Sequence, residues 1–277
     1  MIRAIDCWVN VTMGEGKPPD YLVRVKEDYF KGGDEFFRNL EPDALVEQMD
    51  RAGVEKAVIT IDASRPSEHA LRFAEKHPRR FFFAASLQPT GRMKEIWALE
   101  ALVRSQPVVM ARVVPFGTDT PPSHTRYFPL YVKCIELDLP VSINTGLPGP
   151  PVPGACQDPM HLDRVCVQLP ELRICMAHGA DPWWAVAIRL MLKYRNLHLM
   201  TSAYAPKYLP AELIHFMNTR GADRILFASD HPVLSFERCL KEAQALDLRP
   251  GVLDQYLYAN AERLFFAPRK PRTASGA

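Results

Sequence analysis

Two polar side chains in the second half of the 277-residue chain are of the types that transfer protons in enzymes. His178 directly follows the apolar run 174–177, and Asp230 follows the apolar run 225–228 after a single serine. A partly desolvated carboxylate can take a proton from water, and a nearby imidazole can orient that water, protonate a leaving oxygen or stabilise negative charge. We therefore predict that Asp230 and His178 form the catalytic pair.

Both residues also have a structural interpretation. Asp230 precedes His231 and Pro232, and aspartate is a residue type that caps helices. His178 precedes Gly179 and could be a hydrogen-bonded histidine of the core. The residue types alone do not decide between these interpretations and the catalytic one.

Arg112 interrupts the apolar segment 110–114, which reads MARVV, and simple packing does not explain a charge at that position. A guanidinium can hold a carboxylate or an enolate through paired hydrogen bonds. It could instead form a structural ion pair with Asp6 or Asp230. We predict that Arg112 contributes to substrate binding.

Further polar or aromatic side chains follow other apolar runs. Burying so many hydrogen-bonding groups without partners would be costly, so we expect them to converge on a shared pocket. Besides Arg112, the residues that we assign to substrate binding are Trp8, Asn10, Asn144, Thr145, Tyr204 and His231. For Tyr204, a place in a surface turn is the alternative.

The chain alternates between short apolar runs and amphipathic stretches of helical length, which is typical of repeated βαβ units. The expected strands span residues 2–9, 54–61, 81–87, 108–114, 140–144, 173–177, 197–200 and 225–228. The expected helices span residues 43–52, 67–76, 93–105, 127–137, 161–169, 183–193, 210–220 and 236–246. This pattern predicts an α/β fold, a single-domain (β/α)8 TIM barrel over residues 1–266 with a C-terminal tail over residues 267–277.

An open, doubly wound sheet is the alternative architecture. No glycine-rich phosphate loop follows the first expected strand, and eight strands match the number that closes a barrel. Active sites of such barrels lie at the carboxyl ends of the strands. Closure of the barrel would therefore bring the predicted pocket residues together.

Two long loops interrupt the alternation, one over residues 11–40 after the first strand and one over residues 146–159 after the fifth. Both leave the barrel face that carries active sites, and ordered loops of this length often cover or line a binding site. A surface excursion without a catalytic role is the alternative. The proline density of the second loop favours a rigid wall over a moving flap.

Several segments together resemble the amidohydrolase-related TIM-barrel family. They are IDCWVN at 5–10, MAHGADPW at 176–183, TSAY at 201–204, FASDHP at 227–232 and ANAERLF at 259–265. The family includes aminocarboxymuconate semialdehyde decarboxylase, resorcylate decarboxylase and pyrone dicarboxylate lactonase. The resemblance follows the chain in order over nearly its whole length, and it implies the same barrel.

The resemblance also implies a divalent metal site. In the family, a His-x-His pair on the first strand, a histidine on the fifth and an aspartate on the eighth hold the metal, while a histidine after the sixth strand acts as an acid or base. His178 matches the sixth-strand histidine, and Asp230 matches the eighth-strand aspartate.

The remaining family ligands are replaced in this chain. Trp8 and Asn10 stand where the histidine pair is expected, and Asn144 or Thr145 stands at the fifth-strand position. A catalytic zinc needs about three His, Asp, Glu or Cys ligands, and an indole cannot ligate a metal at all. We therefore predict no metal ligands and no cofactor, with weak binding of a divalent ion such as zinc as the alternative.

These features lead to three hypotheses of function. The first is a metal-independent, amidohydrolase-like hydrolase that cleaves a lactone, ester or amide of a small carboxylated or aromatic compound. The second is a decarboxylase or another lyase, in which His178 or Asp230 delivers a proton to the substrate. The third is a barrel without catalysis that acts as a binding or scaffold protein.

The composition restricts the partners of the protein. A net charge of +2 on a chain with 24% charged residues argues against nucleic-acid binding. No apolar run approaches the roughly 20 residues that span a bilayer, and the six cysteines show no CxxC spacing and predict reduced core thiols. We expect a cytoplasmic protein with a small-molecule substrate and no membrane partner, and a homodimer as the default assembly.

Overall fold

A computed structural model describes residues 3–18 and 20–269. Eight parallel strands form one sheet in which every strand pairs with the next one along the chain. The strands are β1 (Ala4–Val9), β2 (Val54–Asp62), β3 (Phe81–Ser86), β4 (Val108–Val113), β5 (Val141–Asn144), β6 (Ile174–Ala177), β7 (Leu197–Met200) and β8 (Ile225–Leu226). All eight predicted strands are present; residue 2 of the first lies outside the described residues.

The first and last strands meet and bring the sheet round into a nearly closed barrel. The backbone N–H of Cys7 donates to the carbonyl of Phe227 at 3.2 Å, and the N–H of Asn10 donates to the carbonyl of His231 at 2.8 Å. A parallel bridge between Val9 and His231 continues this contact beyond the end of β8. The predicted (β/α)8 TIM barrel is confirmed, and the open doubly wound sheet is excluded.

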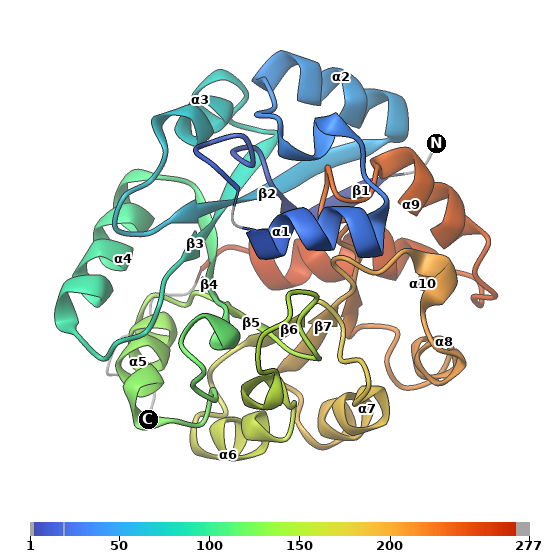
Figure 1. The fold of residues 1–277 in the computed structure, drawn as a ribbon. Helices are drawn as coiled ribbons and strands as arrows, with labels where there is room; N and C mark the ends of the chain where they lie inside the picture. The colour runs from blue at the N-terminus through green and yellow to red at the C-terminus, as the bar shows by residue number, and fades with distance from the viewer. Residues whose placement is uncertain (1–2, 19, 270–277) are drawn as a thin grey trace.

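Helices surround the strands (Figure 1). The eight predicted helices correspond to α2 (Pro42–Ala52), α3 (Glu68–Lys76), α4 (Met93–Ser105), α5 (Phe128–Glu136), α6 (His161–Gln168), α7 (Trp184–Lys193), α8 (Ala211–Met217) and α9 (Phe236–Gln244). Local signals mark several boundaries: Ser67 and Ser235 accept hydrogen bonds from the first turns of α3 and α9, and Gly53 ends α2 with a φ of 87°.

The core has two layers because strand side chains alternate between the faces of the sheet. On β5, Val141 and Ile143 pack in the outer layer against the helices, while Ser142 and Asn144 occupy the alternate positions. A second apolar cluster, which includes Cys7 and Cys175, fills the inside of the barrel. All six cysteines are free and buried, as predicted for core thiols.

Three short helical segments near the C-terminus were not predicted. They are α10 (Val252–Asp254), η7 (Gln255–Ala259) and η8 (Glu262–Phe266). Ala261, Leu264 and Phe265 pack with the inner apolar cluster of the barrel. Their apolar spacing does not follow the ordinary helical period because η7 and η8 are π-helical, and this explains why the pattern was missed.

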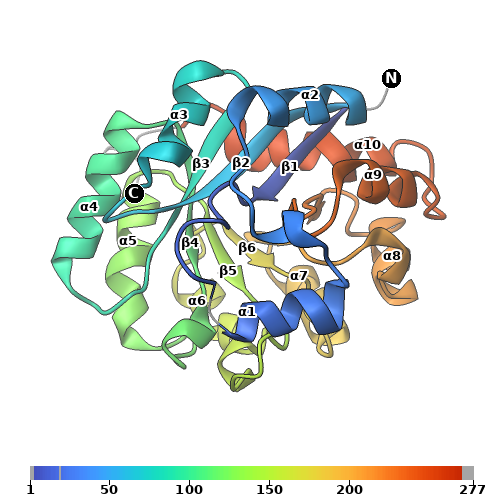
Figure 2. The ribbon, with the colours of Figure 1, turned by 45° about the horizontal axis from the view of Figure 1, so that its top comes forward.

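Part of the predicted loop 11–40 is helical. It contains α1 (Asp20–Arg24), η1 (Val25–Phe30) and η2 (Asp34–Phe37). Figure 1 shows α1 crossing in front of the barrel, and Figure 2 shows it lying apart from the ring of helices that pack on the strands. This segment therefore covers the end of the barrel rather than its side.

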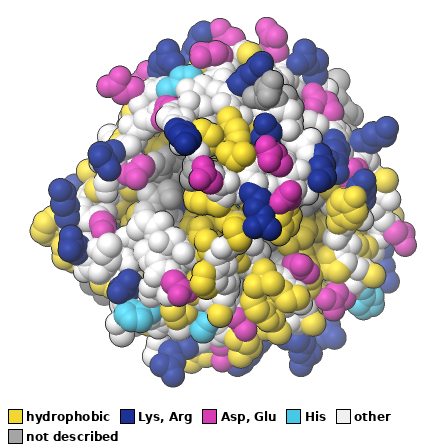
Figure 3. Space-filling model, in the orientation of Figure 1, with side chains coloured by type: hydrophobic (Ala, Val, Ile, Leu, Met, Phe, Trp, Pro, Cys, Tyr) yellow, Lys and Arg dark blue, Asp and Glu magenta, His cyan; other side chains and the backbone are white. Residues whose placement is uncertain are grey.

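The second long loop meets this cover. A Cβ added at Gly149 would lie 3.7 Å from the buried side chain of Val25 in η1, at ordinary van der Waals distance. The side-chain amide of Gln157 donates to the carbonyl of Gly146 at 2.8 Å and fixes the base of the loop. Hydrophobic side chains extend across the middle of this face, with charged side chains both among them and around its edge (Figure 3).

The described part of the tail packs on the barrel, since the Arg269 guanidinium donates to the carbonyl of Val108. Residues 270–277 of the predicted tail lie outside the described residues. Among the helices of residues 3–18 and 20–269, none is long and apolar enough to cross a membrane.

Candidate active site

Asn10 connects Trp8 to Asp230 at the junction of the first and last strands. The Trp8 indole Nε1–H donates to Oδ1 of Asn10 at 3.2 Å, and Nδ2 of Asn10 donates to Oδ1 of Asp230 at 2.8 Å. An indole N–H can only donate, so the oxygen of the Asn10 amide must face Trp8. The amide N–H groups of Asn10 are thereby turned toward the Asp230 carboxyl group.

Asp230 stands on a tight turn after β8. Its φ is 67°, a left-handed conformation that non-glycine residues adopt rarely and at some energetic cost. Its backbone N–H donates to the carbonyl of Trp8 at 3.1 Å, which holds the turn against β1. Burial raises the pKa of the Asp230 carboxyl group to about 7, although the Asn10 hydrogen bond and the positive charge of Arg112 act in the opposite direction.

A fully buried aspartate positions this turn, and sequence reasoning gave it no role of this kind. Asp6 accepts hydrogen bonds from the Trp8 N–H at 3.0 Å and from the Ser229 N–H and hydroxyl at 3.1 and 2.5 Å. It therefore ties the end of β1 to the residue before Asp230. The available signal was an acidic residue inside an apolar strand, which needs several partners when buried.

His178 follows β6 in a similar left-handed conformation, with a φ of 62°. Its backbone N–H donates to the hydroxyl of Ser202 at 3.0 Å, and its ring centroid lies 4.2 Å from that of Trp8. Nδ1 of the ring is buried without a hydrogen-bond partner. Burial and the nearby Arg112 lower the pKa of His178 to about 4, so the imidazole is neutral at physiological pH.

Arg112 lies inside the barrel with no exposed surface. Its guanidinium donates to the hydroxyl of Thr60 and, at 3.0 Å, to the carbonyl of Cys7, and its Cζ lies 3.3 Å from the centroid of the Trp8 ring. Among the described residues, no carboxylate lies within ion-pair distance of it. The structural ion pair with Asp6 or Asp230 is therefore wrong, and the assignment of Arg112 to substrate binding stays a prediction.

Two residues at the end of β5 form the wall beside His178. The Thr145 hydroxyl donates to the carbonyl of Gly179 at 2.6 Å, so it fastens β5 to the turn that carries His178. Asn144 is buried, and its Oδ1 has no hydrogen-bond partner. Their assignment to substrate binding stays a prediction, and Thr145 has in addition a clear structural contact.

Tyr204 is half-buried and lies near the same turn. Its ring packs edge-on against Trp184 with centroids 5.2 Å apart, and both rings would be touched by a side chain at position 179. Glycine is needed at this position, since Gly179 also has a φ of 66°. The structure therefore places Tyr204 beside Gly179, the residue that follows His178, rather than in an isolated surface turn.

His231 is oriented differently from the other predicted pocket residues. Its ring stacks on Phe236 at the start of α9, with centroids 4.0 Å apart and planes 13° apart. Both ring nitrogens are buried without partners, and burial lowers the pKa of His231 to about 4. Only the His231 backbone contacts Asn10, through its carbonyl, and the His231 ring stacks on Phe236 instead.

The side chains at this site do not fit a catalytic divalent metal. In the described part of the chain, no group of three or more His, Cys, Asp or Glu side chains could hold one. Oδ1 of Asp230 accepts from Asn10, and the oxygen of Asn10 is turned toward an indole. The buried Arg112 charge behind Trp8 would in addition repel a second cation.

The eight-stranded barrel, with a buried carboxyl group after β8 and a histidine after β6, defines the protein as a TIM barrel with ionisable side chains at the carboxyl ends of its strands. The chain belongs to the amidohydrolase family, whose model, named Amidohydrolase, matches residues 5–267. No protein of curated function matches the sequence.

Solved structures share the fold at low sequence identity. An uncharacterized TIM-barrel protein from Bordetella bronchiseptica has a TM-score of 0.78 and 24% identity, covering 95% of this chain and 98% of its own. A dihydroxybenzoic acid decarboxylase from Polaromonas sp. JS666, solved with manganese and 2-nitroresorcinol, has a TM-score of 0.68 and 19% identity, with coverage of 96% and 97%. A probable 2-pyrone-4,6-dicarboxylic acid hydrolase from Acinetobacter baumannii, solved with citric acid, has a TM-score of 0.63 and 16% identity, with coverage of 96% and 100%.

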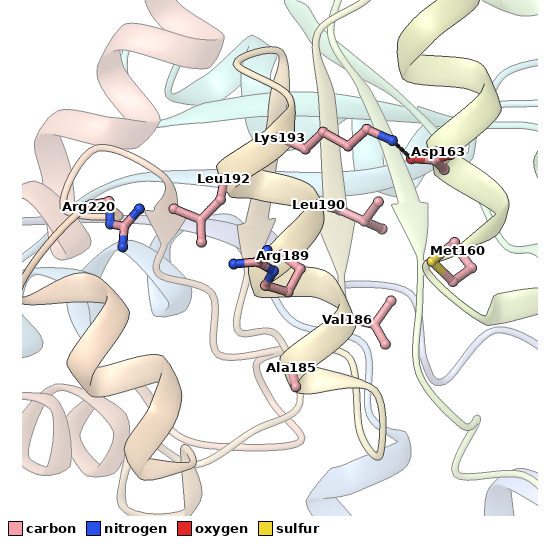
Figure 4. A pocket seen from close by; sticks show the side chains of 9 residues that line it. All are labelled: Met160, Asp163, Ala185, Val186, Arg189, Leu190, Leu192, Lys193 and Arg220. Carbon is pink, nitrogen blue, oxygen red and sulfur yellow. Dashed lines mark hydrogen bonds and ion pairs between the residues drawn. The ribbon is translucent and has the colours of Figure 1, made fainter.

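A separate groove lies on the outside of the barrel between α6 and α7 (Figure 4). Met160 and Asp163 line one side, and Ala185, Val186 and Arg189 line the other. Across the groove, Lys193 and Asp163 form an ion pair. None of the predicted pocket residues lines this groove, so we do not assign the candidate chemistry to it.

Proposed function

We propose that the chain is a hydrolase that cleaves a lactone, ester or amide of a small carboxylated or aromatic compound without a divalent metal. The observation that carries this proposal is the Asp230 carboxyl group, which Asn10 holds at 2.8 Å and whose pKa burial raises to about 7. A base with a pKa near the working pH combines an available carboxylate with a strong tendency to take a proton.

The first step is attack by water on the substrate carbonyl. The Asp230 carboxylate takes a proton from water while the water oxygen forms a bond to the carbonyl carbon, and the C=O electron pair moves onto the carbonyl oxygen. His178 is neutral, so it can donate one N–H to this developing oxyanion without carrying a full charge. Water activation thus belongs to the carboxylate and charge stabilisation to the imidazole.

The second step is collapse of the tetrahedral intermediate. The oxyanion electron pair re-forms the C=O bond, the bond to the leaving oxygen or nitrogen breaks, and the leaving atom takes the proton held by Asp230. The carboxylate of Asp230 is thereby regenerated. A carboxyl group with a pKa of about 7 suits both directions of proton transfer better than an ordinary aspartate would.

The surroundings favour a planar substrate. The half-buried Tyr204 supplies aromatic surface beside Gly179, the residue that follows His178, and the segment that carries α1 covers the mouth of the barrel. Aromatic side chains stack favourably on planar rings, and a covered mouth excludes bulk water from the reacting group. These features support a pyrone, a lactone ring or a substituted benzene as the substrate class.

A decarboxylase is the second candidate, and the same pKa supports it. At neutral pH about half of the Asp230 side chains still carry a proton. Loss of CO2 from an aromatic acid leaves a carbanion that must take a proton at carbon, and a protonated Asp230 could supply it. Hydrolysis remains our first proposal because an ester carbonyl is already electrophilic without a metal.

The two candidates are separated by the products from a defined panel. The purified, tag-free protein is incubated with 2-pyrone-4,6-dicarboxylate, simple aryl esters and lactones, and dihydroxybenzoates. We expect a ring-opened or hydrolysed acid from the first groups and no CO2 from the last. Release of CO2 from a dihydroxybenzoate would replace the hydrolase proposal by the lyase one.

Replacement of Asp230 tests the proposed base. We expect Asp230→Asn to lower kcat by at least a thousand-fold, and Asp50→Asn, which changes an exposed ion pair with Arg80, to leave it unchanged. Retention of most activity in Asp230→Asn would remove Asp230 from the mechanism. If the whole panel binds without turnover, the barrel is a binding protein and the hydrolase proposal fails.

A further inference from the structure

We propose that Arg112, stacked behind the Trp8 indole, is a built-in fixed cation that takes the electrostatic place of the divalent metal at this site. This inference deepens the proposed function and rests on it. Arg112 is a positioning residue in this proposal, because its charge acts across Trp8 and it does not touch the substrate.

The first observation is the stack itself. Cζ of Arg112 lies 3.3 Å from the centroid of the Trp8 ring, and the His178 ring centroid lies 4.2 Å from that of Trp8. Two planar groups cannot share one face of an indole at these distances without overlapping. Trp8 therefore lies between Arg112 and His178, and a cation–π contact holds the guanidinium on its inner face.

The second observation is that this cation is buried without an anionic partner. Its hydrogen bonds go to neutral atoms, the oxygens of Thr60 and Cys7 and the sulfur of Met110, and its Nε–H has no partner. A buried charge is costly to desolvate, and proteins usually pair it with a carboxylate. Burial lowers the pKa of Arg112, and the charge of Asp230 is the largest effect that raises it. This coupling to Asp230 indicates that the buried charge serves the site rather than the packing.

The third observation concerns the residues that stand at the positions expected for metal ligands. Trp8 supplies no metal ligand, and Asn10 is committed to Trp8 and Asp230. Trp8 and Asn10, which stand where two metal ligands are expected, connect the guanidinium of Arg112 to the carboxyl group of Asp230. A fixed positive charge remains, but it comes from the chain and needs no free coordination site.

The consequence concerns the charge of the bound molecule. A cation behind the indole lowers the energy of negative charge that develops in front of it, beside His178 and Asp230. The site should therefore favour anionic ligands and an oxyanion over neutral analogues. The cation should also act against protonation of His178. Burial and the charge of Arg112 lower the pKa of His178, while the hydrogen bond to Ser202 raises it.

The test measures the ionisation of His178 by NMR in the absence of substrate. In Arg112→Met, which removes the charge but keeps most of the volume, we expect the His178 pKa to rise by about one pH unit. Arg112→Lys should leave it within a few tenths of the wild-type value. His198 is the internal control, because burial lowers its pKa and the nearby charges that act on it are those of Arg224, Asp223 and Arg263, not that of Arg112.

An unchanged His178 pKa in Arg112→Met would overturn the proposal. Should that variant fail to fold, Arg112→Gln answers the same question. Titration of the wild-type protein with Mn²⁺ alone is a second readout: we expect no selective broadening of the His178 signals, and selective broadening at submillimolar Mn²⁺ would also overturn the proposal. Neither measurement involves turnover, so their failure is distinguishable from loss of the proposed hydrolase activity, which Asp230→Asn tests.

Discussion

Nδ2 of Asn10 lies 2.8 Å from Oδ1 of Asp230 and donates to it, although 220 positions separate the two residues in the chain. This bond stabilises the ionised carboxyl group and so lowers the pKa of Asp230, while burial raises it. Together with the charges of Arg112 and Asp6, these two effects set the pH at which Asp230 can act as a base.

Removal of this hydrogen bond should move the acidic limb of the activity profile. In Asn10→Ala the Asp230 pKa should rise above its value of about 7. If it rises by about one pH unit, the carboxylate fraction at pH 7 falls from about one half to about one tenth, and kcat/KM falls roughly five-fold. Activity should recover at pH 9, which serves as the control. An acidic limb at the same pH in both proteins would contradict the role of Asn10.

Asp6 should contribute strongly to stability because it accepts three hydrogen bonds while fully buried. We expect Asp6→Ala to lower the free energy of unfolding by about 2–4 kcal/mol, since it leaves buried donors unpaired. Ser229→Ala, which removes only the hydroxyl donor, should cost about 1 kcal/mol. Urea unfolding measures both variants, and equal losses would mean that the network around Asp6 is not the cause.

Asp230 should destabilise the folded protein at alkaline pH. Its pKa is raised from 3.8 to about 7, so the folded state binds this proton more tightly than the unfolded state. The resulting stabilisation is complete below pH 3.8 and is lost as the pH rises through 7. Asp230→Asn should therefore gain roughly 1–3 kcal/mol over the wild type at pH 8 and little at pH 4. A gain that is the same at both pH values would contradict the raised pKa.

His198 should make the protein sensitive to acid. Burial lowers its pKa from 6.5 to about 4, so the unfolded state takes up the proton first as the pH falls below 6.5. The stability that this histidine contributes is present above pH 6.5 and is lost on acidification. When the pH falls from 7 to 5, the free energy of unfolding should fall by up to about 2 kcal/mol less in His198→Gln than in the wild type. Equal falls in the free energy of unfolding of both proteins, measured with denaturant, would contradict the lowered pKa of His198.

Much of the fold followed from local pattern. Strand and helix bounds agree within a few residues because each strand is a short apolar run and each barrel helix has one apolar face. The segments 20–30 and 252–266 were missed, since they pack on the ends of the barrel rather than on its side. Their helices are short or π-helical and lack the ordinary period.

The amino-acid sequence by itself determined the barrel, the positions of Asp230 and His178 after late strands, and the non-histidine residues at positions 8, 10 and 144. These properties depend on residue type and on periodicity along the chain, which are local. The tertiary structure alone decided that Asn10 binds Asp230, that Asp6 ties Ser229 to Trp8, and that Arg112 stacks behind the indole without an ion pair. Closure of the barrel decides them, because contacts between residues more than 100 positions apart leave no trace in local sequence.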